Sequence, residues 1–213
     1  MMRIDSVASQ PDRAGRHAVR FSDGSTMRLY RQTIQDFGLY IGLEMSEEAF
    51  VQLKEAASQM SAKMRAVRIV SASSISKKDL EQRLIYKGED PKQAKNAVTW
   101  MEELDLIDDE KTAQQIVRKC AAKGYGVSRA KQMLYEKRIP KEYWEEALAD
   151  YPDQTEAITA FLRSRLSKDW DEKDLRKAKD ALIRRGHSYG DIRKGLQMLS
   201  LDEEFPEEYE WQI

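Results

Sequence analysis

From residue 46 onward, apolar residues recur every three or four positions along most of the chain. This spacing places them on one face of an α-helix, so the pattern predicts a largely helical protein. Ser46 followed by Glu47 and Glu48 is typical of a helix N-terminus, where a side-chain oxygen accepts a free backbone N–H and acids suit the helix dipole.

One helix in the middle of the chain is marked at both ends. Asp108 or Asp109 can cap its N-terminus, and Gly124 stands where a left-handed residue commonly closes a helix. The apolar stripe between these ends consists of Ala113, Ile116, Val117, Cys120 and Ala121. The stripe predicts an amphipathic helix that packs on other parts of the chain.

The N-terminal part shows a different pattern. His17–Phe21 and Thr26–Tyr30 are short β-type runs, and the Asp-Gly pair between them is a hairpin signal. Arg3–Ser9 predicts a third strand, and Thr33–Phe37 a helical turn. So small an element is unstable alone, so we expect it to pack on the following helices.

An internal repeat organises the helical part. Aligning Val67 with Val117 and Leu162 places leucines at 84, 134 and 182 in one column. Further matching sets are Leu80, Ala130 and Ala178; Lys87, Lys137 and Arg185; Gly88, Arg138 and Gly186; Ala94, Trp144 and Ile192; and Val98, Leu148 and Leu196. Residues that suit helix starts are Ser76, Asp90, Pro140 and Ser188.

These observations predict an all-α fold: an elongated tandem array of three three-helix repeats, preceded by a small N-terminal β-hairpin element. The predicted parts are a β-hairpin extension at 1–45, helical repeats at 46–107, 108–151 and 152–200, and an acidic tail at 201–213. Each repeat should have its own apolar cluster, because neighbouring repeats in such arrays make mainly local contacts.

The net charge of −1 is unevenly distributed. The last 13 residues hold six acidic and no basic side chains, which leaves +5 on the rest of the chain. A weakly basic body permits contact with nucleic acid. Aromatic residues lie among the acids of the tail, so the tail could dock on the third repeat or on a partner; a frayed acidic end is the alternative.

The sequence also favours a monomeric, cytoplasmic protein without a membrane span. It contains no run of 18 apolar residues, and its first residues lack the apolar segment of a signal peptide. Its single cysteine, Cys120, cannot form an internal disulfide, which fits a reducing compartment. Because Cys120 lies on the apolar helix face, we predict a core residue.

Few residues suit catalysis. His17 and His187 are far apart, and the chain has neither a Cys/His ligand spacing nor a glycine-rich phosphate loop. The doublet Asp108-Asp109 is better explained as a helix cap than as a metal pair or general base. We therefore expect a protein that is not an enzyme and uses no cofactor or metal.

The candidate binding residues form a basic strip on the first helix of each repeat: Arg65, Arg68, Arg118, Lys119, Lys123, Arg163, Arg165 and Lys168. Such a strip could follow a phosphate backbone or an acidic groove; the alternative is a solvated face with local ion pairs. The larger aromatic residues are predicted to pack between helices rather than stack on bases: Trp100, Trp144, Trp170 and Tyr143.

Over about residues 60–200 the chain resembles the RecX family of bacterial RecA regulators. The resemblance rests on Ala66-Val67-Arg68 with the following Ser76, Asp79-Leu80, Leu84 and Lys87-Gly88; on Leu106-Ile107-Asp108-Asp109 with Ala113; and on Gly126 through Leu134 with Lys137-Arg138-Ile139. The chain departs from the family at Thr112, where an aromatic residue is usual, and at Arg138, where glycine is usual.

The resemblance implies an elongated helical protein of three three-helix repeats that binds RecA and its DNA filament, usually inhibiting the recombinase. The DNA contact would be without sequence specificity. The alternative is a stand-alone helix-turn-helix-like DNA-binding protein. Acidic residues on the predicted third helices would repel the phosphates of DNA, which argues against sequence-specific recognition. These residues are Glu102, Glu103, Glu145, Glu146 and Asp191.

Overall fold

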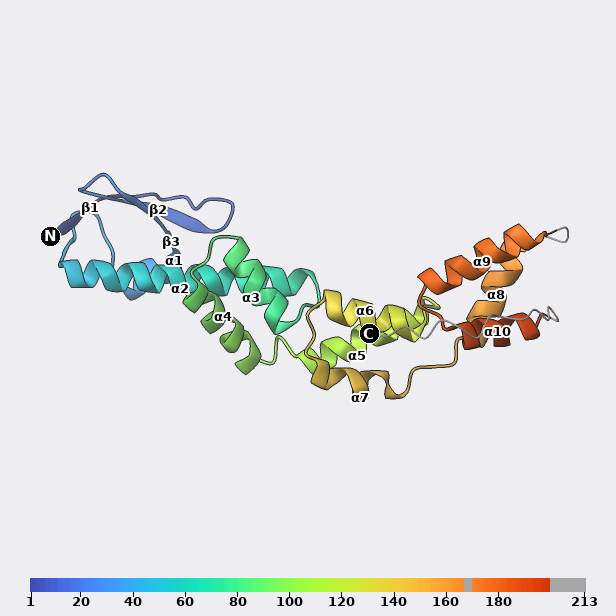
Figure 1. Cartoon of the computed structure of the whole chain (residues 1–213). Helices are drawn as coiled ribbons and strands as arrows, with labels where there is room; N and C mark the ends of the chain where they lie inside the picture. Colours follow the sequence, from blue (N-terminus) through green and yellow to red (C-terminus); the bar gives the residue numbers. More distant parts are fainter. Residues whose placement is uncertain (167–169, 200–213) are drawn as a thin grey trace. The chain divides into compact units, whose positions relative to one another are not determined.

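The computed structural model describes residues 1–166 and 170–199 of the chain. The chain divides into two compact units, the first comprising Met1–Asp108 and the second beginning at Asp109. Figure 1 shows the strands and helices of both units. Lys168 and the predicted acidic tail lie outside the described residues. The five parts predicted from the sequence, with their bounds, stay predictions.

The first unit opens with a four-stranded antiparallel sheet in the order β3-β2-β1-β4. Its elements are β1 (Met2–Val7), β2 (Arg16–Phe21), β3 (Thr26–Tyr30), the helix α1 (Arg31–Asp36) and β4 (Glu44–Met45). The hairpin, the third strand and the helical turn were predicted from the sequence. The short strand β4 was not, because only its pairing with β1 defines it.

The sheet is stabilised by the first half of the long helix α2 (Glu47–Ala72). Phe50 and Leu53 of this helix join a buried cluster with residues of the strands, among them Phe21. The rings of Phe21 and Phe50 meet edge to face, with centroids 5.0 Å apart. The prediction that the sheet packs on the following helices is therefore confirmed.

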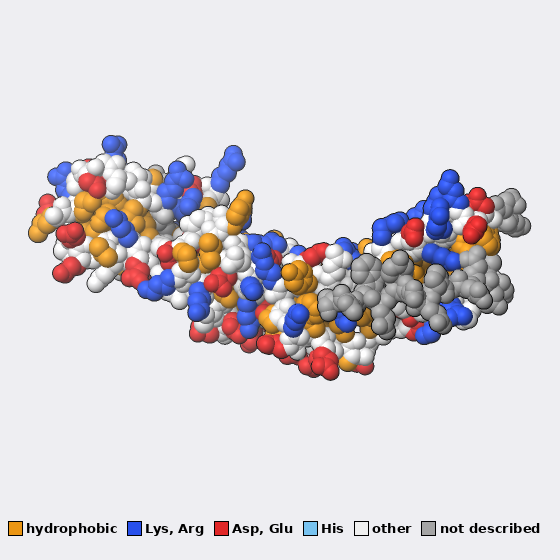
Figure 2. Space-filling model, in the orientation of Figure 1, with side chains coloured by type: hydrophobic (Ala, Val, Ile, Leu, Met, Phe, Trp, Pro, Cys, Tyr) orange, Lys and Arg blue, Asp and Glu red, His pale blue; other side chains and the backbone are white. Residues whose placement is uncertain are grey.

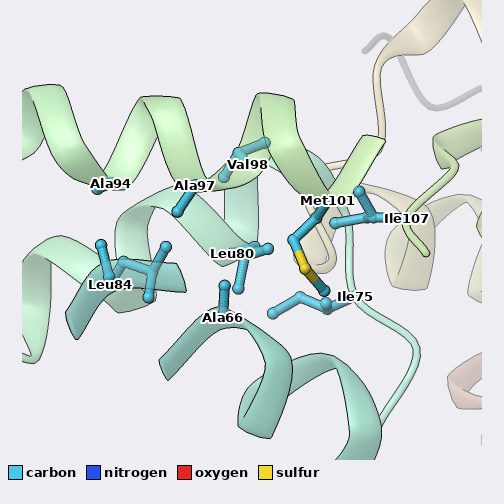
Figure 3. Packing of buried hydrophobic residues seen from close by; sticks show 10 residues of the cluster. Ala66, Ile75, Leu80, Leu84, Ala94, Ala97, Val98, Met101 and Ile107 are labelled. Atoms are coloured by element: carbon cyan, nitrogen blue, oxygen red, sulfur yellow. The ribbon is translucent and has the colours of Figure 1, made fainter. Parts of the chain in front are cut away.

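The second half of α2 packs against α3 (Lys77–Tyr86) and α4 (Pro91–Glu103). Figure 3 shows side chains of the three helices pointing toward one another, among them Ala66, Leu80 and Ala97. The helix starts follow from the sequence. Ser46, Ser76 and Asp90 each accept the backbone N–H of the residue three positions later.

The second unit contains two further groups of three helices. The first group consists of α5 (Asp109–Ala122), α6 (Val127–Glu136) and α7 (Trp144–Ala149), with a 3₁₀ turn at Lys141–Tyr143 before α7. The second group consists of α8 (Thr155–Arg165), α9 (Glu172–Arg184) and α10 (Tyr189–Gln197). The helix expected directly after Pro140 thus begins as a 3₁₀ turn.

The residues aligned in the internal repeat occupy corresponding places. Val67 packs on one apolar cluster, Val117 belongs to a second and Leu162 to a third, as the alignment predicts. The leucines at 84, 134 and 182 are buried, one in each cluster. The second residue after the second helix has a positive φ in all three groups: 89° at Gly88, 54° at Arg138 and 85° at Gly186.

A backbone junction connects the two helix groups of the second unit. In the turn before α6, Gly126 donates its N–H to the carbonyl of Arg185 in the turn before α10, at 3.0 Å. A Cβ atom on Gly126 would lie 1.9 Å from the carbonyl oxygen of Gly186, so no side chain fits there. We call this contact, together with His187, the glycine junction.

His187 completes the glycine junction and is 5% exposed. Its Nε2 lies 3.0 Å from the carbonyl oxygen of Gly124 and must donate to it, because a carbonyl can only accept. Its Nδ1 is then an acceptor, and it has no partner among the described residues. Burial lowers the pKa of His187, which favours the neutral imidazole in the junction.

Candidate functional site

The basic residues selected from the sequence are divided between the two units. Arg65 and Arg68 lie on α2 in the first unit. In the second unit, Arg118 and Lys119 lie on α5, Lys123 follows its last residue, and Arg163 and Arg165 lie on α8. On the face in Figure 2, Lys and Arg side chains lie among Asp and Glu side chains in both units.

Arg65 has a local partner. Its Nε donates to Glu89, whose side chain is 6% exposed and also accepts the hydroxyl of Ser61 at 3.0 Å. The guanidinium therefore balances a buried carboxylate, and removing it would leave that charge without its cation. Arg65 thus forms a local ion pair, which was the alternative to a role in binding.

Arg68 connects α2 to the N-terminal sheet. Its guanidinium donates to the hydroxyl of Tyr30 at 3.2 Å and to the carbonyl of Ala14 at 3.4 Å. Arg68 is nevertheless exposed. Its charge therefore still acts on the surface around it.

Arg65 and Arg68 share a hollow of about 340 Å³ with residues of α3 and of the segment that precedes it. The lining residues are Arg65, Arg68, Ile69, Ala72, Ser73, Arg83 and Lys87. Four of these side chains are cationic. We call this feature the basic hollow.

Sequence reasoning missed the contribution of α3 to the basic hollow. Lys87 stood out only as a basic position of the internal repeat, and Arg83 carried no signal. Arg83 pairs with Asp79 one turn earlier, at 3.1 Å, and its side chain is still 44% exposed. Lys87 is exposed at the end of α3.

The basic residues of the second unit have exposed side chains. Arg118, Lys119 and Lys123 form no ion pair with any other residue in the described part of the chain. Arg163 is likewise exposed, whereas the Arg165 guanidinium lies 5.4 Å from the ring centroid of Phe161.

One position of the repeat carries arginine in all three helix groups. Arg68, Arg118 and Arg163 each directly follow the aligned apolar residue at 67, 117 or 162. All three are exposed, and the arginine of the first group also hydrogen-bonds to the sheet region. The same position thus carries a surface charge in all three groups.

The large aromatic residues pack as predicted. Trp100, Trp144 and Trp170 contact three different apolar clusters, and Tyr143 joins Trp144. Trp144 also donates its indole N–H to the carbonyl of Ile139 at 3.0 Å. These rings are therefore committed to packing rather than to base stacking.

Cys120 is 1% exposed, and burial raises the pKa of its thiol, which makes it a poor nucleophile.

Within residues 1–166 and 170–199, no three His, Cys, Asp or Glu side chains are grouped to hold a metal ion. No helix in that same part of the chain is long and apolar enough to cross a membrane.

Comparison with known proteins decides the family. The family model described as RecX, second three-helix domain, matches residues 108–148, which include α5, α6 and α7. The regulatory protein RecX of Xanthomonas axonopodis pv. citri is 31% identical over 132 residues, which are 61% of this chain and 82% of that protein. The chain belongs to the RecX family. Its resemblance to that family, drawn from motifs, is confirmed.

Other RecX proteins match over longer stretches. The regulatory protein RecX of Clostridioides difficile is 25% identical over 212 residues, 94% of this chain and 97% of that protein. The Vibrio parahaemolyticus protein of the same name is 28% identical over 146 residues, 67% of this chain and 94% of that protein. These relatives are named as regulatory proteins, which fits a protein that is not an enzyme.

Solved RecX structures share the fold. A crystal structure of a regulatory protein RecX has a TM-score of 0.63 at 18% identity, covering 95% of this chain and all of that one. The RecX of Lactobacillus salivarius has a TM-score of 0.60 at 26% identity, covering 69% of this chain and 99% of that one. The mainly helical fold is thus that of RecX proteins, here with a small N-terminal antiparallel sheet.

The two departures from the RecX pattern both have a structural setting. Thr112 is 7% exposed in the first half of α5, where it lies directly before the core residue Ala113. Arg138 takes the left-handed conformation that its glycine counterparts at 88 and 186 also take. Thr112 thus occupies a packed position, and Arg138 an exposed turn position with a left-handed backbone.

Proposed function

We propose that this protein regulates RecA by binding along the RecA–DNA filament and lowering recombinase activity. The observation that carries the proposal is membership of the RecX family, with a relative that matches 94% of the chain. The exposed basic side chains of α5 and α8 support contact with an acidic surface, whether phosphate or protein. RecA and DNA are therefore the proposed partners.

The proposal includes the repeat architecture. We regard α2–α4, α5–α7 and α8–α10 as three three-helix repeats, because each group has its own apolar cluster and its own left-handed turn after the second helix. An array of such units suits a filament, since one position of the repeat can meet successive sites of a repeating partner. The recurring arginine at 68, 118 and 163 is such a position.

The proposed DNA contact is without sequence specificity. Exposed acids on the third helices, Glu103 on α4 and Glu145 and Glu146 on α7, would repel phosphates if those helices entered a groove. Phosphate contacts by Lys and Arg carry no sequence information. A stand-alone DNA reader is therefore not proposed.

A RecA strand-exchange reaction tests the proposal directly. Adding the protein should slow product formation, and the effect should be strongest when the protein is present while filaments form. Co-sedimentation with RecA–DNA filaments should exceed co-sedimentation with DNA alone at the same salt concentration. Unchanged strand exchange, or binding that does not depend on RecA, would contradict it.

A further inference from the structure

We propose that the basic hollow and the neighbouring side chain of Tyr86 form a binding site for single-stranded nucleic acid. One backbone phosphate would occupy the hollow, and an unpaired base would stack on the tyrosine ring. The inference rests on the proposed function for its DNA setting, and it goes further by naming the form of nucleic acid and the side chains that hold it.

The charges of the basic hollow suit a phosphate. Of its four cations, two come from α2, one from α3 and one from the residue that follows α3; two of them are paired with carboxylates, those of Glu89 and Asp79. A net positive charge is therefore left for an incoming anion. The two ion pairs also hold the guanidinium groups in place, so that less freedom is lost when the anion binds.

Lys87 is the most available of these cations. It is exposed and has no ion pair within the part of the chain that the structure describes. Its ammonium group on a flexible stem can follow a phosphate as it enters. Arg83, by contrast, is paired with Asp79 and would act mainly through its charge.

Tyr86 supplies the second half of the site. It is 90% exposed, more than any other aromatic side chain in the described residues. An exposed tyrosine alone needs no explanation. This one follows Arg83, which lines the hollow, by three positions, so the two side chains are neighbours on the surface of α3.

An aromatic ring beside a cationic groove is the arrangement by which proteins hold single strands. The hollow alone would accept a phosphate of either a duplex or a single strand. The ring can stack only on a base that is not already paired and stacked, which favours the single strand. An acidic peptide could use the cations but would leave the ring without a function.

The test measures binding of the full chain, without RecA, to three labelled probes: a single-stranded oligothymidylate, an abasic strand of equal length and charge, and a duplex. Tyr86→Ala should weaken thymidylate binding by about five- to a hundred-fold, the usual effect of losing one stacked base, and leave abasic-strand binding unchanged. Tyr86→Phe should bind like the parent.

Lys87→Gln should weaken binding to the thymidylate and the abasic strand by the same factor and reduce the salt dependence of both. Tyr135→Ala is the matched control, because this tyrosine also lies near a helix end and is 72% exposed, but it is remote in sequence from the hollow. It should bind all three probes like the parent.

The inference is overturned if Tyr86→Ala binds thymidylate like the parent, or if it weakens the thymidylate and the abasic strand equally. It is also overturned if the parent binds no single strand. Failure of the proposed function gives a different result, since strand exchange would then be unaffected by the parent whatever Tyr86 does. Equal melting midpoints of parent and variants will show that folding is intact.

Discussion

The two units of this protein join their parts by different means. In the first unit, one continuous helix, α2, connects the sheet to the first helix group, and apolar side chains form both contacts. In the second unit, the glycine junction brings two turns together through backbone atoms. A side-chain contact spreads its energy over many residues, whereas a backbone contact depends on having no side chain at one position.

The largest effect is expected at the side-chain contact of the first unit. Leu53 is completely buried between α2 and the sheet, so Leu53→Ala should lower the free energy of unfolding by about 2–5 kcal/mol. Urea unfolding followed by circular dichroism measures this. Val51→Ala, at an exposed site on the same helix, is the control and should change stability little. Equal unfolding of both variants would contradict the comparison.

Disrupting the glycine junction should lower stability less than Leu53→Ala does, and the effect should depend on which glycine is replaced. Gly126→Ala would place Cβ against the backbone of Gly186, and the resulting displacement should cost about 1–3 kcal/mol. Gly190→Ala is the matched control, because its Cβ would meet only the Ser188 hydroxyl at 3.7 Å. Within α10 this alanine should be neutral or stabilising. Thermal melting of both variants measures this. A lower melting midpoint for Gly126→Ala alone indicates a steric clash, whereas equal decreases in both would indicate a general effect of replacing glycine.

The basic side chains of the second unit should affect binding rather than stability. Replacing Arg118, Lys119 and Lys123 together with glutamine should weaken RecA–DNA filament binding roughly tenfold at low salt, since each exposed contact contributes about 0.5 kcal/mol. The difference should shrink at high salt because surface charges are screened. Filament co-sedimentation over a salt series measures both.

A charge-matched control separates this surface from net charge. Arg13, Arg20 and Arg28 are exposed in the N-terminal sheet region, and their replacement by glutamine removes the same charge. If both triple variants lose the same affinity, total charge governs binding and the α5 surface has no special role. If neither loses affinity, the α5 surface does not contact the filament.

The smallest effect is expected from pH. Because the pKa of His187 is lowered below 6.5 by burial, the unfolded state binds the proton first as the pH falls. The stabilisation that depends on the neutral ring is fully present above pH 6.5. It decreases as the pH falls through 6.5 toward the pKa of His187 in the folded state. Asp191 and Arg185 are the charged groups acting on the ring, in opposite directions. Melting midpoints over this range should fall more for the parent than for His187→Gln.

Features decided by neighbouring residues could be predicted from the sequence. The caps at Ser46, Ser76 and Ser188 follow from residues within one helical turn, and the hairpin follows from Asp-Gly between two β-type runs. The apolar spacing likewise identified core residues such as Leu84 and Leu134. In each case the physical cause is local or periodic.

Features decided by distant residues could not be predicted. The basic hollow combines cations of α2 and α3, and no spacing in the sequence indicates that these helices share a surface there. The close approach of Gly126 to Gly186 depends on how two turns meet in space. Among the selected cations, sequence reasoning also could not separate Arg65, which balances buried Glu89, from Arg118, which is exposed.

The continuity of α2 has a consequence for how the first unit opens. Its N-terminal half belongs to the sheet cluster and its C-terminal half to the cluster with α3 and α4. Unfolding of α2 would remove residues from both clusters at once. The sheet and the first helix group therefore constitute one cooperative unit, and their slowest amide protons should exchange through a shared opening event. The N-terminal sheet is thereby protected from fraying by the same helix that packs against α3 and α4.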